Sequence, residues 1–345
     1  MSIYFFAIFV SFLVNSILIV PFINFLYKIK FRRANQSTKD AFNKRTPIFD
    51  KYNKSKVGRP VGGGILTVVL TVILFTFFLF LFVVFEEPLI TNFPSFSSEI
   101  KIILFSFISF AFLGIYDDLN KIFFWKKKDF FGLRLRHKLI IEIILAGIVS
   151  WWLFNDLKIN IIHIPFFGVY NLSYLYIIFS TFTIVAFANA VNITDGVDGL
   201  ASGVLLITLL SFWVIAYTII DVPTLLFLAV WIGGIIAFLY FNIYPARLFL
   251  GDAGALSFGA TFAVIGLILG KALALPIIGG VFVIEILSSL IQLLSKKFFK
   301  RKAFSVAPFH LWLQNRSWDE PKIVMRMWVI SILFSVFGLM IAFLK

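Results

Sequence analysis

The sequence contains no cysteine, few histidines and few charged side chains. Among its 345 residues there are 0 Cys, 3 His and 14% charged residues. Without cysteine the chain can form no disulfide, thiolate nucleophile, cysteine zinc site or iron–sulfur cluster, and three histidines argue against a histidine-rich metal site. Soluble domains carry about 25% charged residues. The deficit therefore excludes a soluble enzyme and a disordered chain.

Hydrophobic residues make up 61% of the chain, and 46 residues are Phe. Apolar segments long enough for a helix to cross a hydrocarbon core recur along the whole sequence. We expect ten, at roughly 3–26, 62–85, 100–116, 139–154, 173–191, 199–220, 224–241, 253–270, 272–294 and 323–344. The sequence thus predicts an all-α polytopic membrane protein, with residues 1–345 forming one membrane domain. Alternation with Pro and Gly over 159–173 predicts a short outer β-hairpin.

The basic residues are distributed unevenly between the connections. Of the 31 Lys and Arg residues, 26 lie in connections 27–61, 117–138, 242–252 and 295–322. These four connections share one side if ten spans alternate, and the positive-inside rule makes that side cytoplasmic, with both termini outside. The net charge of +14 suits anionic lipid headgroups or a phosphorylated substrate. Nucleic acid is not expected as a partner of so apolar a chain.

Adjacent carboxylates, Asp117 and Asp118, end the third predicted span. Ionisable groups at membrane depth are costly and by default mark a functional site. Neighbouring carboxylates repel each other, so such a pair can bind a divalent cation or divide into an acid and a base. The alternative is that both side chains are solvated at a helix end.

Two further polar clusters stand at connections between spans. The first is NAVNITDGVDGL (189–200), and the second is FNIYPARLFLGDAG (241–254). Their Asp and Asn oxygens suit Mg²⁺ or ribose hydroxyls, and their glycines allow close backbone approach to a ligand. The alternative is ordinary helix capping by Thr194, Asp195 or Asp252.

All three clusters fall on the predicted cytoplasmic side, among lysines. Carboxylates, Mg²⁺ and lysines together are suited to phosphoryl transfer, because the cations stabilise phosphate charge and a carboxylate can activate the nucleophile. We expect one substrate to be a soluble pyrophosphate compound. The other should be a lipid, since the site opens at the edge of the bilayer.

These clusters resemble those of the polyprenyl-phosphate N-acetylhexosamine-1-phosphate transferase superfamily, and within it the MurNAc-pentapeptide transferase (MraY) family. The similarity covers nearly the whole chain. Its motifs are GRPVGGGIL (58–66), DDLNK (117–121), GLRLRHK (132–138), NAVNITDGVDGLASG (189–203), NIYPARLFLGDAG (242–254), VFVIEILSSLIQL (281–293) and APFHLWLQNRSWDEPKIVMRMWVIS (307–331).

The resemblance implies a reaction in peptidoglycan synthesis. Undecaprenyl phosphate would attack UDP-MurNAc-pentapeptide to give lipid I and UMP, with Mg²⁺ as cofactor. The enzyme would lie in the bacterial inner membrane with its active site facing the cytoplasm. We favour direct attack over a covalent phospho-Asp intermediate, because a charged lipid phosphate needs positioning more than a relay. A homodimer is one option for the assembly.

The resemblance also assigns roles by position. Asp117 would deprotonate or place the lipid phosphate, Asp118 would support it, and Asp252 would bind Mg²⁺ with Asn192 as a second ligand. Lys121 and Lys138 would hold phosphates, and His310 would lie near the sugar phosphate. The remaining expected substrate contacts, to nucleotide or sugar, are Asn189, Asp195, Asp198, Asn242 and Gly251.

One departure from the family pattern affects specificity. The family usually has three consecutive histidines after Ala-Pro-x, where this chain has His310, Leu311 and Trp312. A transferase acting on UDP-GlcNAc or a related sugar is therefore an alternative, and an ion-coupled transporter a remote one. Two acids inside predicted spans, Glu142 and Glu285, are not assigned to the site, although Glu285 matches the family and could brace it.

Overall fold

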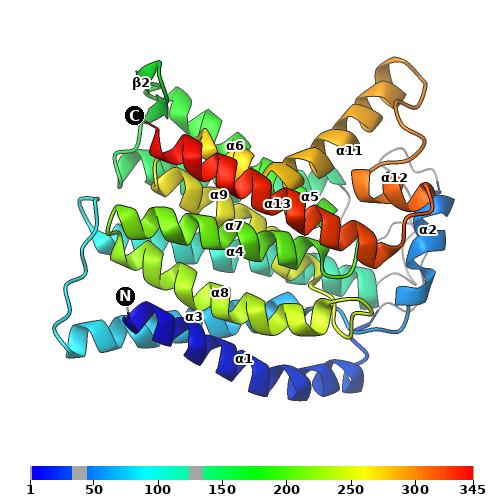
Figure 1. Cartoon of the computed structure of the whole chain (residues 1–345), viewed down its shortest axis with the longest axis horizontal. Coiled ribbons are helices and arrows are strands. Elements are labelled where there is room, and N and C mark those ends of the chain that lie inside the picture. The colour runs from blue at the N-terminus through cyan, green and yellow to red at the C-terminus, as the bar shows by residue number, and fades with distance from the viewer. Residues whose placement is uncertain (1, 33–44, 124–134, 345) are drawn as a thin grey trace.

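Nine long apolar helices form the body of the computed structural model, which describes residues 2–32, 45–123 and 135–344 (Figure 1). They are α1 (Ser2–Lys28), α3 (Gly63–Val84), α4 (Phe96–Phe123), α5 (Leu135–Asn155), α6 (Leu175–Thr194), α7 (Leu200–Thr218), α8 (Val222–Asn242), α9 (Gly251–Ile268) and α13 (Glu320–Phe343). Helices suit a lipid environment because they satisfy their backbone hydrogen bonds internally. The predicted all-α, multi-pass membrane architecture is confirmed.

The described residues also contain six short elements and one further long helix. They are α2 (Pro47–Asn53), the 3₁₀ helix η1 (Lys54–Lys56), β1 (Ile161–Ile164), β2 (Gly168–Asn171), α10 (Ala274–Ile278), α11 (Gly280–Phe298) and α12 (Phe309–Asn315). The two strands pair antiparallel, with Ile161 opposite Asn171 and Ile164 opposite Gly168. The predicted β-hairpin is therefore present.

The ninth apolar segment, predicted as one span over 272–294, is divided in the structure. It forms α10 and α11, separated at Gly279, and α11 diverges from the other long helices (Figure 1). A side chain at Gly279 would meet the ring of Phe187 at 2.7 Å, so close packing occurs at the break. The sequence did not reveal the division because the apolar run continues across it.

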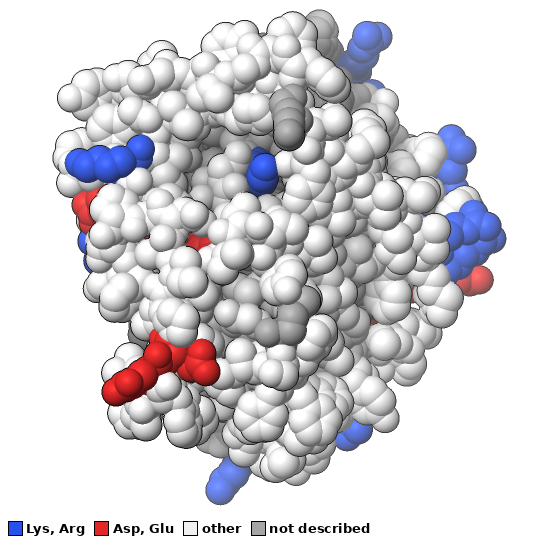
Figure 2. All heavy atoms as spheres, turned by 60° about the vertical axis from the view of Figure 1, so that its left-hand side comes forward, with Lys and Arg blue, Asp and Glu red and all other residues white. Residues whose placement is uncertain are grey.

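The two ends of the bundle differ in what they carry. Both chain termini and the β-hairpin lie at one end, here called the termini end, while α2 and α12 lie at the other, the basic end (Figure 1). The described parts of connections 27–61 and 295–322 thus share one end, as predicted. The basic runs within 33–44 and 124–134 lie outside the described residues. Figure 2 brings the termini end forward, and its Lys and Arg side chains are scattered among uncharged ones.

Helix α9 lies at the centre of the bundle and brings its neighbours close. Its span is 100% buried, against 22% for α1. Small residues let membrane helices approach closely, and at Gly114 of α4 an added Cβ would stand 2.2 Å from the carbonyl oxygen of Asp252. This contact places the end of α4, with its two aspartates, beside the start of α9.

Candidate active site

Two aspartates from different helices face the same pair of lysines at the basic end. Asp117 and Lys121 lie on α4, Lys138 on α5 and Asp252 on α9. Each lysine Nζ lies 3.1 Å from Asp117 Oδ2 and 2.7 Å from Asp252 Oδ2. The sequence-predicted catalytic acids and phosphate-binding lysines therefore form one cluster, here called the α4–α9 cluster.

The α4–α9 cluster is buried, so the loss of any one of its ion pairs would cost more free energy than the loss of an exposed pair. Asp117 is 2% exposed and Asp252 8% exposed. Removing one member of a buried ion pair leaves an uncompensated charge, which typically costs about 3–5 kcal/mol. The lysines thus stabilise the ionised form of both carboxylates, and an incoming phosphate could exchange with those carboxylates for the same ammonium groups.

Asp118 points to the backbone at the start of α9. Its Oδ2 accepts a hydrogen bond from the Ala253 N–H at 3.2 Å. Gly251 has φ +77°, and a Cβ there would stand 2.7 Å from the same oxygen. Gly251 therefore allows α9 to begin against Asp118. This geometry fits the supporting role predicted for Asp118, and the substrate contact predicted for Gly251 stays a prediction.

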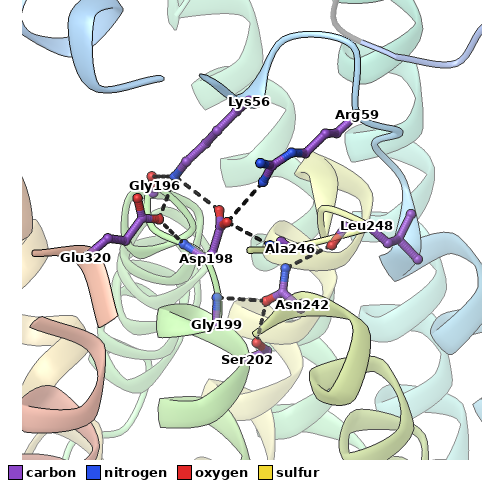
Figure 3. A network of polar contacts seen from close by, with 10 residues as sticks. All are labelled: Lys56, Arg59, Gly196, Asp198, Gly199, Ser202, Asn242, Ala246, Leu248 and Glu320. Carbon is purple, nitrogen blue, oxygen red and sulfur yellow. Dashed lines mark hydrogen bonds and ion pairs between the residues drawn. The ribbon is translucent and has the colours of Figure 1, made fainter. Parts of the chain in front are cut away.

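A second group of polar residues, drawn in Figure 3, surrounds the buried carboxylate of Asp198. Lys56 Nζ lies 3.2 Å from Asp198 Oδ1, Arg59 Nη1 lies 3.3 Å from Oδ2, and the Ala246 N–H donates to Oδ2 at 2.9 Å. Glu320 accepts hydrogen bonds from Lys56 Nζ at 3.0 Å and from the Asp198 N–H at 2.7 Å. Asp198 therefore joins η1, the α6–α7 turn, the α8–α9 connection and α13.

Asn242, at the end of α8, completes this Asp198 network. Its Oδ1 accepts from the Gly199 N–H at 3.2 Å and from Ser202 Oγ at 2.6 Å, and its Nδ2 donates to the Leu248 carbonyl at 3.0 Å. Asp198 and Asn242 thus brace the connections around the site. Their predicted contacts with nucleotide or sugar stay predictions.

Three predicted site residues lie along the basic end of α6. Asn189 Nδ2 donates to Glu142 Oε2 at 2.5 Å and to the Val185 carbonyl at 2.9 Å. Asn192 and Asp195 follow at the end of this helix, half-buried. The predicted metal ligation by Asn192 and substrate binding by Asp195 stay predictions.

His310, at the start of α12, is held by Glu285 of α11. Its backbone N–H donates to Glu285 Oε1 at 3.1 Å, and its Nδ1 lies 3.0 Å from Oε2. Its Nε2 faces Gly196, where an added Cβ would approach to 2.5 Å. Glu285 therefore orients the imidazole toward the α6–α7 turn, and its role in bracing the site stays a prediction.

Besides Glu285, four residues of the site had no role predicted from the sequence, for different reasons. Lys56 and Arg59 were indistinguishable from the other basic residues of their connection. Glu320 was visible only as part of the C-terminal motif. Glu142 carried a usable signal, a carboxylate inside an apolar run, but its partner Asn189 lies on another helix.

The cluster's charge bears on the expected Mg²⁺. In the described ranges no group of three His, Asp or Glu side chains is arranged around one metal position. Mg²⁺ is, however, usually bound by one or two carboxylates together with substrate phosphates. Three acids, Asp117, Asp118 and Asp252, lie within electrostatic reach of two lysines, Lys121 and Lys138, so the acidic side chains outnumber the ammonium groups. The donor set therefore fits a divalent cation.

Comparison with known proteins places this site within a class of membrane enzymes. Residues 100–270, which include both aspartates of α4 and Asp252, match the model for Glycosyl transferase family 4. Together with the membrane-spanning fold, this match places the chain among membrane-embedded transferases.

Curated relatives narrow the assignment. The chain is 35% identical to the phospho-N-acetylmuramoyl-pentapeptide-transferase of Clostridium perfringens (strain SM101 / Type A), over 95% of this chain and 93% of the relative. It is 34% identical to the one from Caldanaerobacter subterraneus subsp. tengcongensis, over 95% of both chains. It is 32% identical to the one from Borreliella burgdorferi (strain ZS7), over 94% and 91%. The chain belongs to the phospho-N-acetylmuramoyl-pentapeptide-transferase family.

Proposed function

We propose that this protein transfers phospho-MurNAc-pentapeptide from UDP-MurNAc-pentapeptide to undecaprenyl phosphate, forming lipid I and releasing UMP in peptidoglycan synthesis. The observation that carries the proposal is the convergence of Asp117 and Asp252, from separate helices, on Lys121 and Lys138. The names of the relatives support the choice of substrates. They give no support to an ion-coupled transporter.

The proposed step is a direct displacement at phosphorus. An oxygen of the lipid phosphate forms a bond to the sugar-linked phosphorus of the donor, and the bond from that phosphorus to the bridging oxygen breaks, so that UMP leaves. Lys121 and Lys138 neutralise phosphate charge, which stabilises the transition state. Asp117 places the lipid phosphate or accepts its proton, and Asp118 fixes the start of α9 through Ala253.

We propose Mg²⁺ as the cofactor, bound by Asp252 with Asn192 as a second ligand. The supporting observation is that the α4–α9 cluster together with the neighbouring Asp118 holds three carboxyl groups against two lysines. When bound, the ion would neutralise negative charge on the diphosphate of the donor.

The proposed location is the bacterial inner membrane, with the active site in the cytoplasm. Support comes from the α4–α9 cluster lying at the same end as the described basic connections, which the positive-inside rule assigns to the cytoplasm. A homodimer stays a prediction.

A second donor specificity is favoured by one feature of α12. Where the family pattern has histidines, Leu311 is 1% exposed, and the Trp312 ring stacks on Phe309 at 5.6 Å while Arg316 lies 4.1 Å from it. These packed side chains replace two polar groups, which favours UDP-GlcNAc or a related sugar as an alternative donor.

The test compares the two donors. Purified protein with undecaprenyl phosphate and Mg²⁺ receives either UDP-MurNAc-pentapeptide or UDP-GlcNAc, UMP release is measured, and the radiolabelled lipid product is identified by thin-layer chromatography. Turnover of the pentapeptide donor alone is expected. Turnover of UDP-GlcNAc alone would establish the alternative, and substrate uptake into liposomes without UMP formation would contradict both.

A further inference from the structure

Glu142 lies inside the transferase site although its sequence position gave it no role. It belongs to α5, one turn after Lys138, and is 0% exposed. A carboxylate at this depth is costly unless it has partners or a function. Its Oε2 accepts the hydrogen bond from Asn189, while its Oε1 has no hydrogen-bond partner among the residues that the structure describes.

The hydrogen bonds of Asn189 fix the orientation of its amide. A side-chain amide has two N–H donors on nitrogen and acceptor positions on oxygen. Asn189 Nδ2 reaches two acceptors, Glu142 Oε2 at 2.5 Å and the Val185 carbonyl at 2.9 Å. A flipped amide would place its oxygen against both acceptors. With both donors used inside the protein, the group left for a ligand is the oxygen, Asn189 Oδ1.

Glu142 also interacts electrostatically with the α4–α9 cluster. Its charge acts on Lys138, the residue that bridges Asp117 and Asp252. Glu142 thus connects Asn189 with Lys138. Residues that orient ligand-binding groups in this way typically contribute about 10–100-fold to affinity or activity.

We propose that Glu142 is a positioning residue of the transfer reaction: it holds the Asn189 amide so that its oxygen accepts a hydrogen bond from a hydroxyl of the nucleotide-sugar. The proposal rests on the proposed function. In this role Glu142 accepts a hydrogen bond from Asn189. Activity should therefore depend on an acceptor atom at position 142 more than on a negative charge there.

Two variants of similar size separate these requirements. Glu142→Gln retains a carbonyl acceptor for Asn189, and we expect its kcat/KM to stay within about threefold of the parent. Glu142→Leu removes the acceptor, and we expect kcat/KM to fall by about 10–100-fold, with the loss mainly in the donor KM and in UMP affinity measured calorimetrically without turnover. Ser150→Ala is the matched control, because Ser150 is also buried on α5 and its Oγ has no partner among the described residues; no change is expected.

A double-mutant cycle tests whether Glu142 acts through Asn189. In an Asn189→Ala background, Glu142→Leu should have almost no further effect. Full additivity of the two losses would overturn the proposal, as would parent-like UMP affinity and kcat/KM in Glu142→Leu. If the parent itself gives no UMP release, the proposed function fails, and UMP binding by the variants still tests the amide orientation.

Exchanging the acid and the amide between positions 142 and 189 provides a second test if Glu142→Leu does not fold. Asn189→Asp places two carboxylates against each other and should lose activity and UMP affinity. Adding Glu142→Gln restores a donor and an acceptor with the direction reversed, so at least a partial, about fivefold, recovery of UMP affinity is expected relative to the single variant. Absence of any recovery would overturn the proposal.

Discussion

Helix α4 carries buried acids near both of its ends, and the two ends neutralise them differently. At the basic end, Asp117 faces the ammonium groups of Lys121 and Lys138. At the termini end, Glu99 is 0% exposed and accepts hydrogen bonds from Thr91 Oγ1 at 2.7 Å and Thr224 Oγ1 at 2.6 Å. Asp221, also 0% exposed, lies beside Glu99 and Thr224.

The difference indicates what each end can do. Fixed ammonium groups stabilise ionised carboxylates and create a charged centre that a polyanionic substrate can enter. Hydroxyls supply no charge, so the pair at the termini end needs a proton. Burial and the neighbouring Glu99 accordingly raise the pKa of Asp221 to about 8. The charged groups of the basic end therefore suit the proposed transfer reaction. The pair of Glu99 and Asp221 instead connects the α3–α4 connection to the start of α8.

Removing divalent cations should affect only the basic end. The proposed Mg²⁺ requirement predicts that excess chelator reduces UMP release to background and that added Mg²⁺ restores it. The melting temperature in the absence of substrate should change little, since the lysines already pair with the aspartates. Full activity in chelator would contradict the requirement.

Asp117→Asn tests the charged centre directly. Loss of a general base typically costs about 10²–10⁴-fold in rate, and we expect UMP release to fall within that range. Glu99→Gln, on the same helix but at the opposite end, is the control and should leave kcat nearly unchanged. Activity of Asp117→Asn within twofold of the parent would exclude the base role.

Lys56→Met tests whether a second buried acid at the basic end, Asp198, also depends on its cationic partners. Lys56 is 6% exposed and contacts both Asp198 and Glu320. Breaking such a buried pair should cost about 3–5 kcal/mol and visibly lower the melting temperature. Lys51→Met, on an exposed side chain of α2, should leave the melting temperature unchanged. Equal stability of both variants would show that Arg59 alone compensates Asp198.

Asp221→Asn should produce the smallest effect, a change in pH dependence. Because the pKa of Asp221 is raised from 3.8 to about 8, its stabilising contribution is complete below about pH 4 and is lost as pH rises through 8. An amide at this position needs no proton and can donate to Glu99. The variant should therefore melt a few degrees higher than the parent at pH 8.5. Parallel melting curves of both proteins between pH 5 and pH 9 would contradict this account.

The sequence predicted those features that depend on one segment at a time. Long apolar runs revealed the helices, and acids at their ends revealed Asp117, Asp118 and Asp252, because charge near hydrocarbon requires a reason. What it did not reveal depends on pairing between segments. Nothing local distinguishes Lys56 from its basic neighbours. The role proposed for Glu142 depends on its hydrogen bond with Asn189, which lies on another helix. The break at Gly279 was hidden because the residues on both sides are equally apolar.

The contact at Gly114 has a consequence for how this protein could lose its activity. The absence of a side chain there sets the separation between α4 and α9, one turn from Asp117. A single methyl group at that position would act as a spacer and push the carboxylates of the two helices apart while leaving every ionisable residue in place. A neutral, conservative replacement in the lipid-buried part of the chain could thus silence the enzyme as thoroughly as removal of an aspartate.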